Sequence, residues 1–81
     1  MAEETSQPLV LDARGLNCPM PLLKAKKALN QLEPEGLLKV LATDPGSVRD
    51  FEVFSRQSGH TLLASEQDGD TYTYLIRKKP G

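Results

Sequence analysis

The only cysteine of the chain lies in the stretch Cys18-Pro19-Met20-Pro21, directly before a segment with helical periodicity. A thiol at the N-terminus of a helix feels about half a positive elementary charge, which stabilises the thiolate and lowers its pKa. Arg14 adds positive charge in the same region. The alternative is that a lone cysteine is merely a small buried apolar side chain. A place between a glycine-containing loop and a helix start favours the reactive thiol.

The two prolines are expected to restrict how the thiol is presented. Pro19 at the first helical position costs nothing, because its missing N–H would have no partner there, and Pro21 is still within the first turn. Each proline also limits the backbone of the residue before it. We therefore expect a stiffened Cys18, with the Met20 N–H free to meet a sulfur anion. The alternative is that both prolines only start the helix.

Acyl-transfer chemistry on this thiol would need a base within hydrogen-bond reach and donors for an oxyanion. The only histidine, His60, is predicted at the opposite end of the sheet, as a structural or merely exposed residue. The sequence has no paired carboxylates, glycine-rich phosphate loop or metal-ligand cluster, so we expect no cofactor and no metal. A reactive thiol without such partners suits reversible exchange with another protein's sulfur.

Two helices are predicted from apolar spacing and end signals. The first begins at Pro19 and ends before Pro34. The second begins at Asp44-Pro45, with Asp44 as N-cap, and ends at Gly59. Their inward positions are Leu22, Ala25, Leu29 and Leu32 in the first helix, and Val48, Phe51 and Phe54 or Ser55 in the second.

Four strands are predicted, at Pro8–Asp12, Leu37–Thr43, Thr61–Glu66 and Thr71–Lys78. Asp68-Gly69 predicts a tight hairpin turn between the last two. Right-handed crossovers place both helices on one face of the sheet and leave the other face open to water. Cys18, Asp44 and the hairpin turn then meet at the carboxyl ends of the parallel strands, where open α/β sheets usually place their sites.

Size and composition indicate one small domain. The chain has 81 residues, and we expect a flexible tail at 1–7, a domain at 8–78 and a short tail at 79–81. A net charge of −1 gives no overall basic field for nucleic acid. One cysteine excludes an intramolecular disulfide, and a free thiol fits a reducing cytoplasm. No signal peptide or membrane anchor is predicted at the N-terminus.

The stretch Leu11–Pro21 resembles the signature of the TusA/SirA-like small sulfur carriers, and the similarity extends through Ala42–Ser47 and Asp50 to Gly59. The resemblance implies an α+β two-layer sandwich, β-α-β-α-β-β, similar to the C-terminal domain of translation initiation factor three. Its four-stranded mixed sheet would have the order 1-2-4-3 with strand 4 antiparallel. It also implies that Cys18 accepts a sulfane sulfur as a persulfide, typically from a cysteine desulfurase, and passes it to an acceptor protein.

Other residues of the motif are expected to support Cys18. Asp44 is predicted as a helix cap and Asp12 as an acceptor for backbone N–H groups, in preference to proton transfer. The expected supporting residues are Asp12, Arg14, Gly15, Pro19, Met20, Pro21, Asp44 and Pro45.

The expected partners are a sulfur donor and an acceptor protein, with no direct contact to nucleic acid or membrane, and the chain is expected to be a monomer. Lys24, Lys26 and Lys27 could dock an acidic partner, or form an ordinary solvated helix face. Leu37 and Leu41 should lie on the open sheet face, where they could mark a partner or dimer surface.

The sequence is compatible with two other functions. A regulatory or RNA-binding module could use the same fold, although near-neutral charge and 5% aromatic residues weigh against RNA. A stand-alone thiol enzyme such as a reductase would need a resolving cysteine from elsewhere. A carrier within a relay is therefore preferred to an enzyme. The receiving pathway stays open among tRNA thiolation, molybdenum-cofactor assembly and sulfur oxidation.

Overall fold

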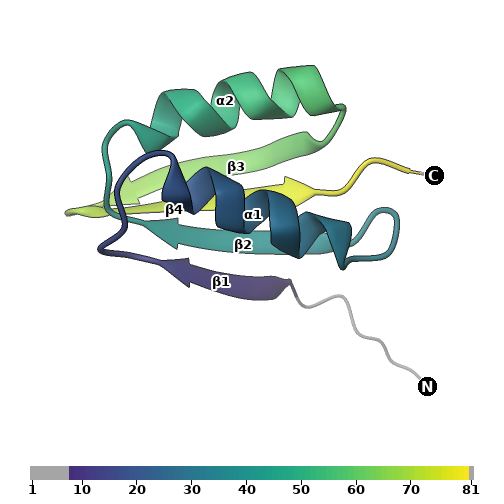
Figure 1. Cartoon of the computed structure of the whole chain (residues 1–81), viewed down its shortest axis with the longest axis horizontal. Helices are drawn as coiled ribbons and strands as arrows, with labels where there is room; N and C mark the ends of the chain where they lie inside the picture. The colour runs from purple at the N-terminus through teal and green to yellow at the C-terminus, as the bar shows by residue number, and fades with distance from the viewer. Residues whose placement is uncertain (1–7, 81) are drawn as a thin grey trace.

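The computed structural model describes residues 8–80, so the predicted tail at 1–7 lies outside the described residues. The elements alternate as the sequence predicts and lie in two layers (Figure 1). In chain order they are β1 (Leu9–Ala13), α1 (Met20–Asn30), β2 (Leu37–Ala42), α2 (Ser47–Ser58), β3 (Thr61–Asp68) and β4 (Thr71–Arg77).

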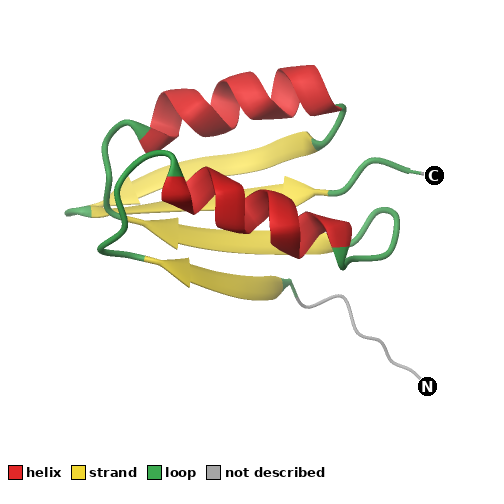
Figure 2. Cartoon of the chain, in the orientation of Figure 1, coloured by secondary structure: helices red, strands yellow, loops and turns green. Residues whose placement is uncertain are grey.

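The four strands form one sheet in the order β1-β2-β4-β3, which confirms the predicted fold. β1 and β2 are parallel, whereas β4 is antiparallel to both of its neighbours. Both helices cover the same face, α1 over β1 and β2, and α2 over β3 (Figure 2). The starts of both helices and the β3–β4 turn therefore gather at one end of the sheet (Figure 1).

The core lies between the sheet and the helices. On β2 the side chains of Leu38, Val40 and Ala42 are fully buried, whereas Lys39 between them is exposed. This period of two is the pattern of a strand with one covered face. Leu37 and Leu41 fall on the open face, as predicted, and are half-buried.

The first helix presents nearly the predicted face to the sheet. Ala25 and Leu29 are buried, and Leu22 and Leu32 pack at the margin of the core. Pro21, predicted only as part of the helix start, is also buried. This proline therefore contributes to packing as well as to the backbone of the first turn.

The second helix differs from the prediction at its start. Val48 was expected to face inward but is 42% exposed, and Ser47 is buried in its place. Phe51 fixes the inward direction because its ring stacks on Tyr74, with centroids 4.5 Å apart. Ser47 lies four residues before Phe51 and so shares its face. There the Ser47 hydroxyl and the Tyr74 hydroxyl form a buried hydrogen bond of 2.7 Å.

The second helix ends as the sequence predicts. Gly59 follows its last residue with a φ of 87°, the left-handed conformation that favours glycine. Within residues 8–80, no helix is long and apolar enough to cross a membrane.

Candidate functional site

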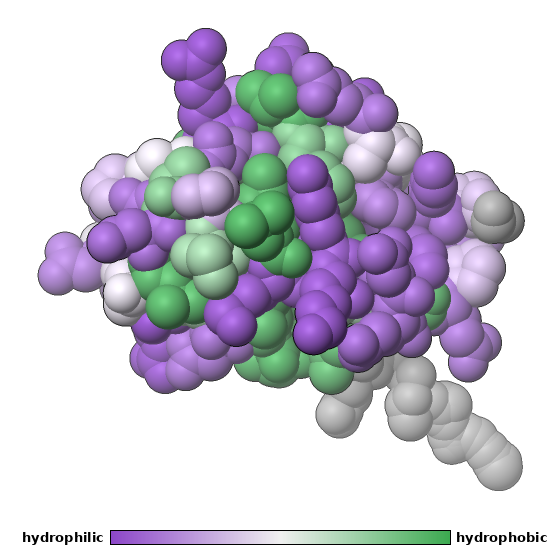
Figure 3. Space-filling view, in the orientation of Figure 1, coloured by the Kyte–Doolittle hydropathy of each residue, from purple (hydrophilic) through white to green (hydrophobic). Residues whose placement is uncertain are grey.

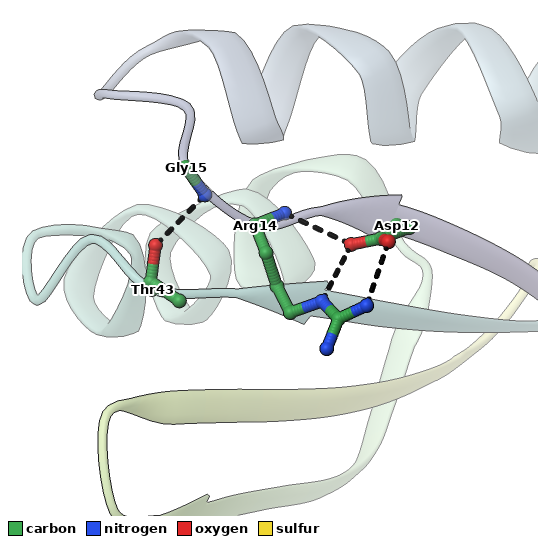
Figure 4. Close-up of polar contacts among 4 residues, drawn as sticks. All are labelled: Asp12, Arg14, Gly15 and Thr43. Atoms are coloured by element: carbon green, nitrogen blue, oxygen red, sulfur yellow. Dashed lines mark hydrogen bonds and ion pairs between the residues drawn. The ribbon is translucent and has the colours of Figure 1, made fainter.

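Cys18 lies in the loop between β1 and α1, and its side chain is exposed. Two long-range hydrogen bonds fasten this loop to the segment after β2. The Gly15 N–H donates to the Thr43 hydroxyl at 2.9 Å (Figure 4), and the Cys18 N–H donates to the Asp44 carboxylate at 2.7 Å. Gly15 has a φ of 82°, so its place in the motif follows from backbone conformation. The parallel pairing of β1 and β2 brings these two loops side by side.

Asp12, near the end of β1, and Arg14, at the start of the loop, form an ion pair (Figure 4). The Arg14 N–H donates to Asp12 at 3.1 Å, as expected for an acceptor of backbone N–H groups. The guanidinium also donates two hydrogen bonds of 2.9 Å, and together these bonds lower the pKa of Asp12 to about 2. The charge of Arg14 is therefore directed at Asp12, and not at Cys18 as the sequence suggested.

Asp44 does not cap the second helix, contrary to the prediction. One of its carboxylate oxygens accepts the Cys18 N–H, and the other accepts the Gly46 N–H at 3.3 Å. The helix begins only at Ser47, because a tight turn closed by the bond from Ser47 N–H to the Asp44 carbonyl precedes it. Pro45 consequently lies in the turn and not at the first helical position. The carboxylate of Asp44 joins the two loops instead.

The thiol of Cys18 donates a hydrogen bond to the carboxylate of Asp50, in the first turn of α2. This bond, partial desolvation and the negative charges of Asp50 and Asp44 all raise the pKa of the thiol. The prediction of a lowered pKa was therefore wrong, because the hydrogen bond to Asp50, desolvation and the two nearby carboxylate charges all favour the neutral thiol. Asp50 was not predicted as a site residue. Two sequence signals point to it: the second helix is predicted to start near Cys18, and acidic residues are favoured in the first turn of a helix.

The first turn of α1 also differs from the expectation. The helix begins at Met20, with Pro19 at the N-cap and Pro21 as its second residue. The Met20 N–H is not free for a sulfur anion, because it donates to the Asn17 carbonyl at 2.8 Å. Pro19 and Met20 are exposed next to Cys18, so they form part of the surface that a partner would meet.

A groove runs between the two helices, beginning beside Asp50. Apolar side chains gather there, with charged side chains around them (Figure 3). Lys26 lies over the groove, with its ammonium 5.6 Å from the centre of the Phe54 ring. Lys24 and Lys27 are exposed on the same helix and do not line the groove. The groove is lined by Leu22, Lys26, Arg49, Asp50, Val53, Phe54 and Gln57.

His60 lies in the connection between α2 and β3, which is at the opposite end of the sheet from the β1–α1 loop that contains Cys18, as the topology predicts (Figure 1). Its Nδ1 accepts the backbone N–H of Lys79 at 3.0 Å, which ties the segment after β4 to the end of α2. Burial and the charges of Lys79 and Lys78 lower its pKa. The residues 8–80 contain no group of three or more His, Cys, Asp or Glu side chains placed to hold a metal ion.

Several relatives of known name cover most of this chain. The sulfur carrier protein TusA of Allochromatium vinosum is 52% identical over 68 residues, which are 84% of this chain and 90% of that protein. A putative sulfur carrier protein of Neisseria meningitidis serogroup A is 56% identical over 85% of this chain and 93% of its own length. The TusA protein of Pseudomonas aeruginosa strain PAO1 is 47% identical over 86% of this chain and 89% of its own length.

A solved structure supports the same relationship. The SirA-like protein of Desulfitobacterium hafniense superposes with a TM-score of 0.76 and 28% sequence identity, covering 88% of this chain and 97% of that one. The family model described as sulfurtransferase TusA matches residues 9–78, from the start of β1 to the residue that follows β4. This chain belongs to the TusA family.

Proposed function

We propose that this protein is a sulfur carrier that holds a sulfane sulfur as a persulfide on Cys18. The main support is the position of this thiol, the only one in the chain. It is exposed at the end of the sheet where the two loops of the motif are fastened together. The names of the relatives support the same role, since they are called sulfur carriers.

The chemistry requires two exchanges between sulfur atoms. The Cys18 thiolate attacks the outer sulfur of a donor persulfide, the S–S bond of the donor breaks, and the donor cysteine leaves as a thiolate that takes up a proton. An acceptor thiolate then attacks the outer sulfur on Cys18, which regenerates the carrier thiolate. No net oxidation occurs in either step. The hydrogen bonds from the Cys18 N–H to Asp44 and from the Gly15 N–H to Thr43 hold the Cys18 loop in place for both partners.

The proposed partners are a donor such as a cysteine desulfurase and a downstream acceptor protein. One thiol supports one sulfur atom per cycle, so the protein acts as a carrier within a sulfurtransferase relay and not as a stand-alone enzyme. We expect it to work as a monomer in the cytoplasm, where a free thiol persists. The acceptor determines whether the sulfur enters tRNA thiolation, molybdenum-cofactor assembly or sulfur oxidation.

The proposal is tested by intact mass after incubation with a cysteine desulfurase and cysteine. The wild-type protein should gain the mass of one sulfur atom, and a reductant should remove it. Cys18→Ser should fold normally and gain nothing, because the side chain is exposed and serine is tolerated before a helix. An equal, reducible gain on the serine variant would refute the assignment, as would an unloaded wild type beside an active desulfurase.

A further inference from the structure

We propose that Asp50 is a specificity-determining residue of this site. Its carboxylate keeps Cys18 as a protonated thiol in the free protein. When a donor protein places a cationic group against this carboxylate, the hydrogen bond to the thiol is lost and Cys18 becomes free to react with the donor's sulfur. The inference rests on the proposed function of Cys18 and adds the chemistry by which a donor is distinguished.

The thiol lies between two carboxylates that come from different segments. Asp50, in the first turn of α2, accepts the S–H, and Asp44, in the loop after β2, accepts the backbone N–H of the same residue. Within residues 8–80 the one ion pair joins Arg14 to Asp12, so neither carboxylate beside Cys18 has a cationic partner. Lys26 and Arg49 line the groove near Asp50 without pairing with it.

These charges decide the protonation state of the resting site. A carboxylate that accepts the S–H stabilises the thiol, and its charge opposes the thiolate. Both effects raise the pKa of Cys18, with a smaller contribution from Asp44. Since the thiolate is the nucleophile, a small electrophile or a free persulfide finds little reactive sulfur at neutral pH.

A cation from the donor would reverse these effects. Asp50 is only partly buried and forms one end of the groove between the helices, so a docked protein can reach its carboxylate. Pairing with a guanidinium or ammonium group would take the carboxylate away from the thiol, and the thiol proton would pass to solvent. The thiolate then attacks the outer sulfur, the donor S–S bond breaks, and the leaving thiolate takes up a proton. The same cation would stabilise the new persulfide anion on Cys18.

The test compares Asp50→Asn with wild type and with Glu52→Gln, which removes an equal charge from an exposed position two residues further along the same helix. Three rates are measured: alkylation by iodoacetamide across pH, loading from glutathione persulfide, and loading from a cysteine desulfurase with cysteine. Circular dichroism monitors folding of each variant.

For Asp50→Asn, the midpoint of the alkylation profile should move to lower pH. The larger thiolate fraction, partly offset by the lower nucleophilicity of that thiolate, predicts alkylation at neutral pH that is several-fold faster. Loading from glutathione persulfide should rise by a similar factor, whereas loading from the desulfurase should stay constant or fall. Glu52→Gln should resemble wild type in all three rates.

An unchanged alkylation profile in Asp50→Asn would overturn the inference, and so would equal acceleration with both donors. A wild type that takes sulfur from neither donor would overturn the proposed function itself, and the donor selectivity with it. If Asp50→Asn does not fold, the two loading rates of the wild-type protein are compared at low and high salt instead. Screening of the cation should then slow loading from the desulfurase more than loading from glutathione persulfide, and equal slowing would contradict the inference.

Discussion

The buried hydrogen bond between Ser47 and Tyr74 should stabilise the start of α2, and its removal has a predictable size. The two oxygens lie 2.7 Å apart and both residues are at most 1% exposed. Ser47→Ala leaves the tyrosine hydroxyl buried without this partner, and Tyr74→Phe does the same to the serine. An unsatisfied buried hydroxyl costs about 1–3 kcal/mol. Because Tyr74→Phe keeps the ring that stacks on Phe51, the free energy of unfolding that this variant loses reports on the hydroxyl alone.

The double variant Ser47→Ala/Tyr74→Phe separates this bond from other effects. Removal of both hydroxyls leaves no unsatisfied group, so the double variant should lose about 1 kcal/mol less than the sum of the two single losses. In a domain of this size each kcal/mol corresponds to a Tm change of about 4–8 °C. Urea unfolding followed by circular dichroism measures the four free energies of unfolding. Tyr72→Phe, at a half-buried position on the same strand, serves as the control and should change stability little.

Additive losses from the two single variants would refute the coupling, and a neutral Tyr74→Phe would show that the hydroxyl finds another partner. The result also bears on the site, since Ser47 anchors the helical turn that carries Asp50.

Four further outcomes are expected. Gly59→Ala should lower the free energy of unfolding by about 1 kcal/mol, because alanine must adopt a φ of 87°, and urea unfolding measures the loss. Carbon NMR titration should give Asp12 a pKa of about 2, and Arg14→Gln should return it toward 3.8. Since folding lowers this pKa, its stabilising contribution is present above pH 3.8 and is lost as the pH falls through 2; acid unfolding of Arg14→Gln that matched wild type would contradict it. Pro21→Ala should slow sulfur transfer between proteins more than alkylation by a small reagent, since the second needs only an exposed thiolate; equal proportional changes would mean that the proline acts on the thiol itself. His60→Ala should leave sulfur transfer unchanged, because the imidazole lies at the far end of the sheet; a large loss with an unaltered circular dichroism spectrum would contradict the topology argument.

Much of the fold follows from local signals in the sequence. The alternation of Leu38, Val40 and Ala42 with outward residues identifies a strand with one covered face. The spacing of Ala25 and Leu29 gives the buried face of α1 for the same reason. The handedness of the crossovers then places both helices on one side, and the resemblance supplies the strand order.

The parts that the sequence did not predict depend on contacts between distant segments. The inward turn of Ser47 follows from the stacking of Phe51 on Tyr74, which a helical pattern alone does not reveal. Asp44 was expected to cap its own helix, but its carboxylate binds the backbone of Cys18, which lies 26 residues earlier.

The protonation of the thiol is the clearest example. A helix start near Cys18 suggests a positive potential at the thiol, and the residues next to it in the sequence offer nothing to oppose that expectation. The opposing charge comes from Asp50, 32 residues away, which reaches the sulfur only when α2 packs beside α1. The motif identifies the reactive atom. The pKa of that atom depends on charges from a distant segment and can therefore be judged only from the three-dimensional structure.

Transfer of a labelled sulfur through the protein would show whether Cys18 carries sulfur from a donor to an acceptor. The carrier is loaded by a cysteine desulfurase with ³⁵S-cysteine, separated from the donor, and mixed with a candidate acceptor protein. We expect the label on the peptide that contains Cys18, and we expect it to leave this peptide at the rate at which it appears on the acceptor. Label that reaches the acceptor equally fast through the Cys18→Ser protein, or that stays on Cys18 with every acceptor tried, would contradict a role as a sulfur carrier.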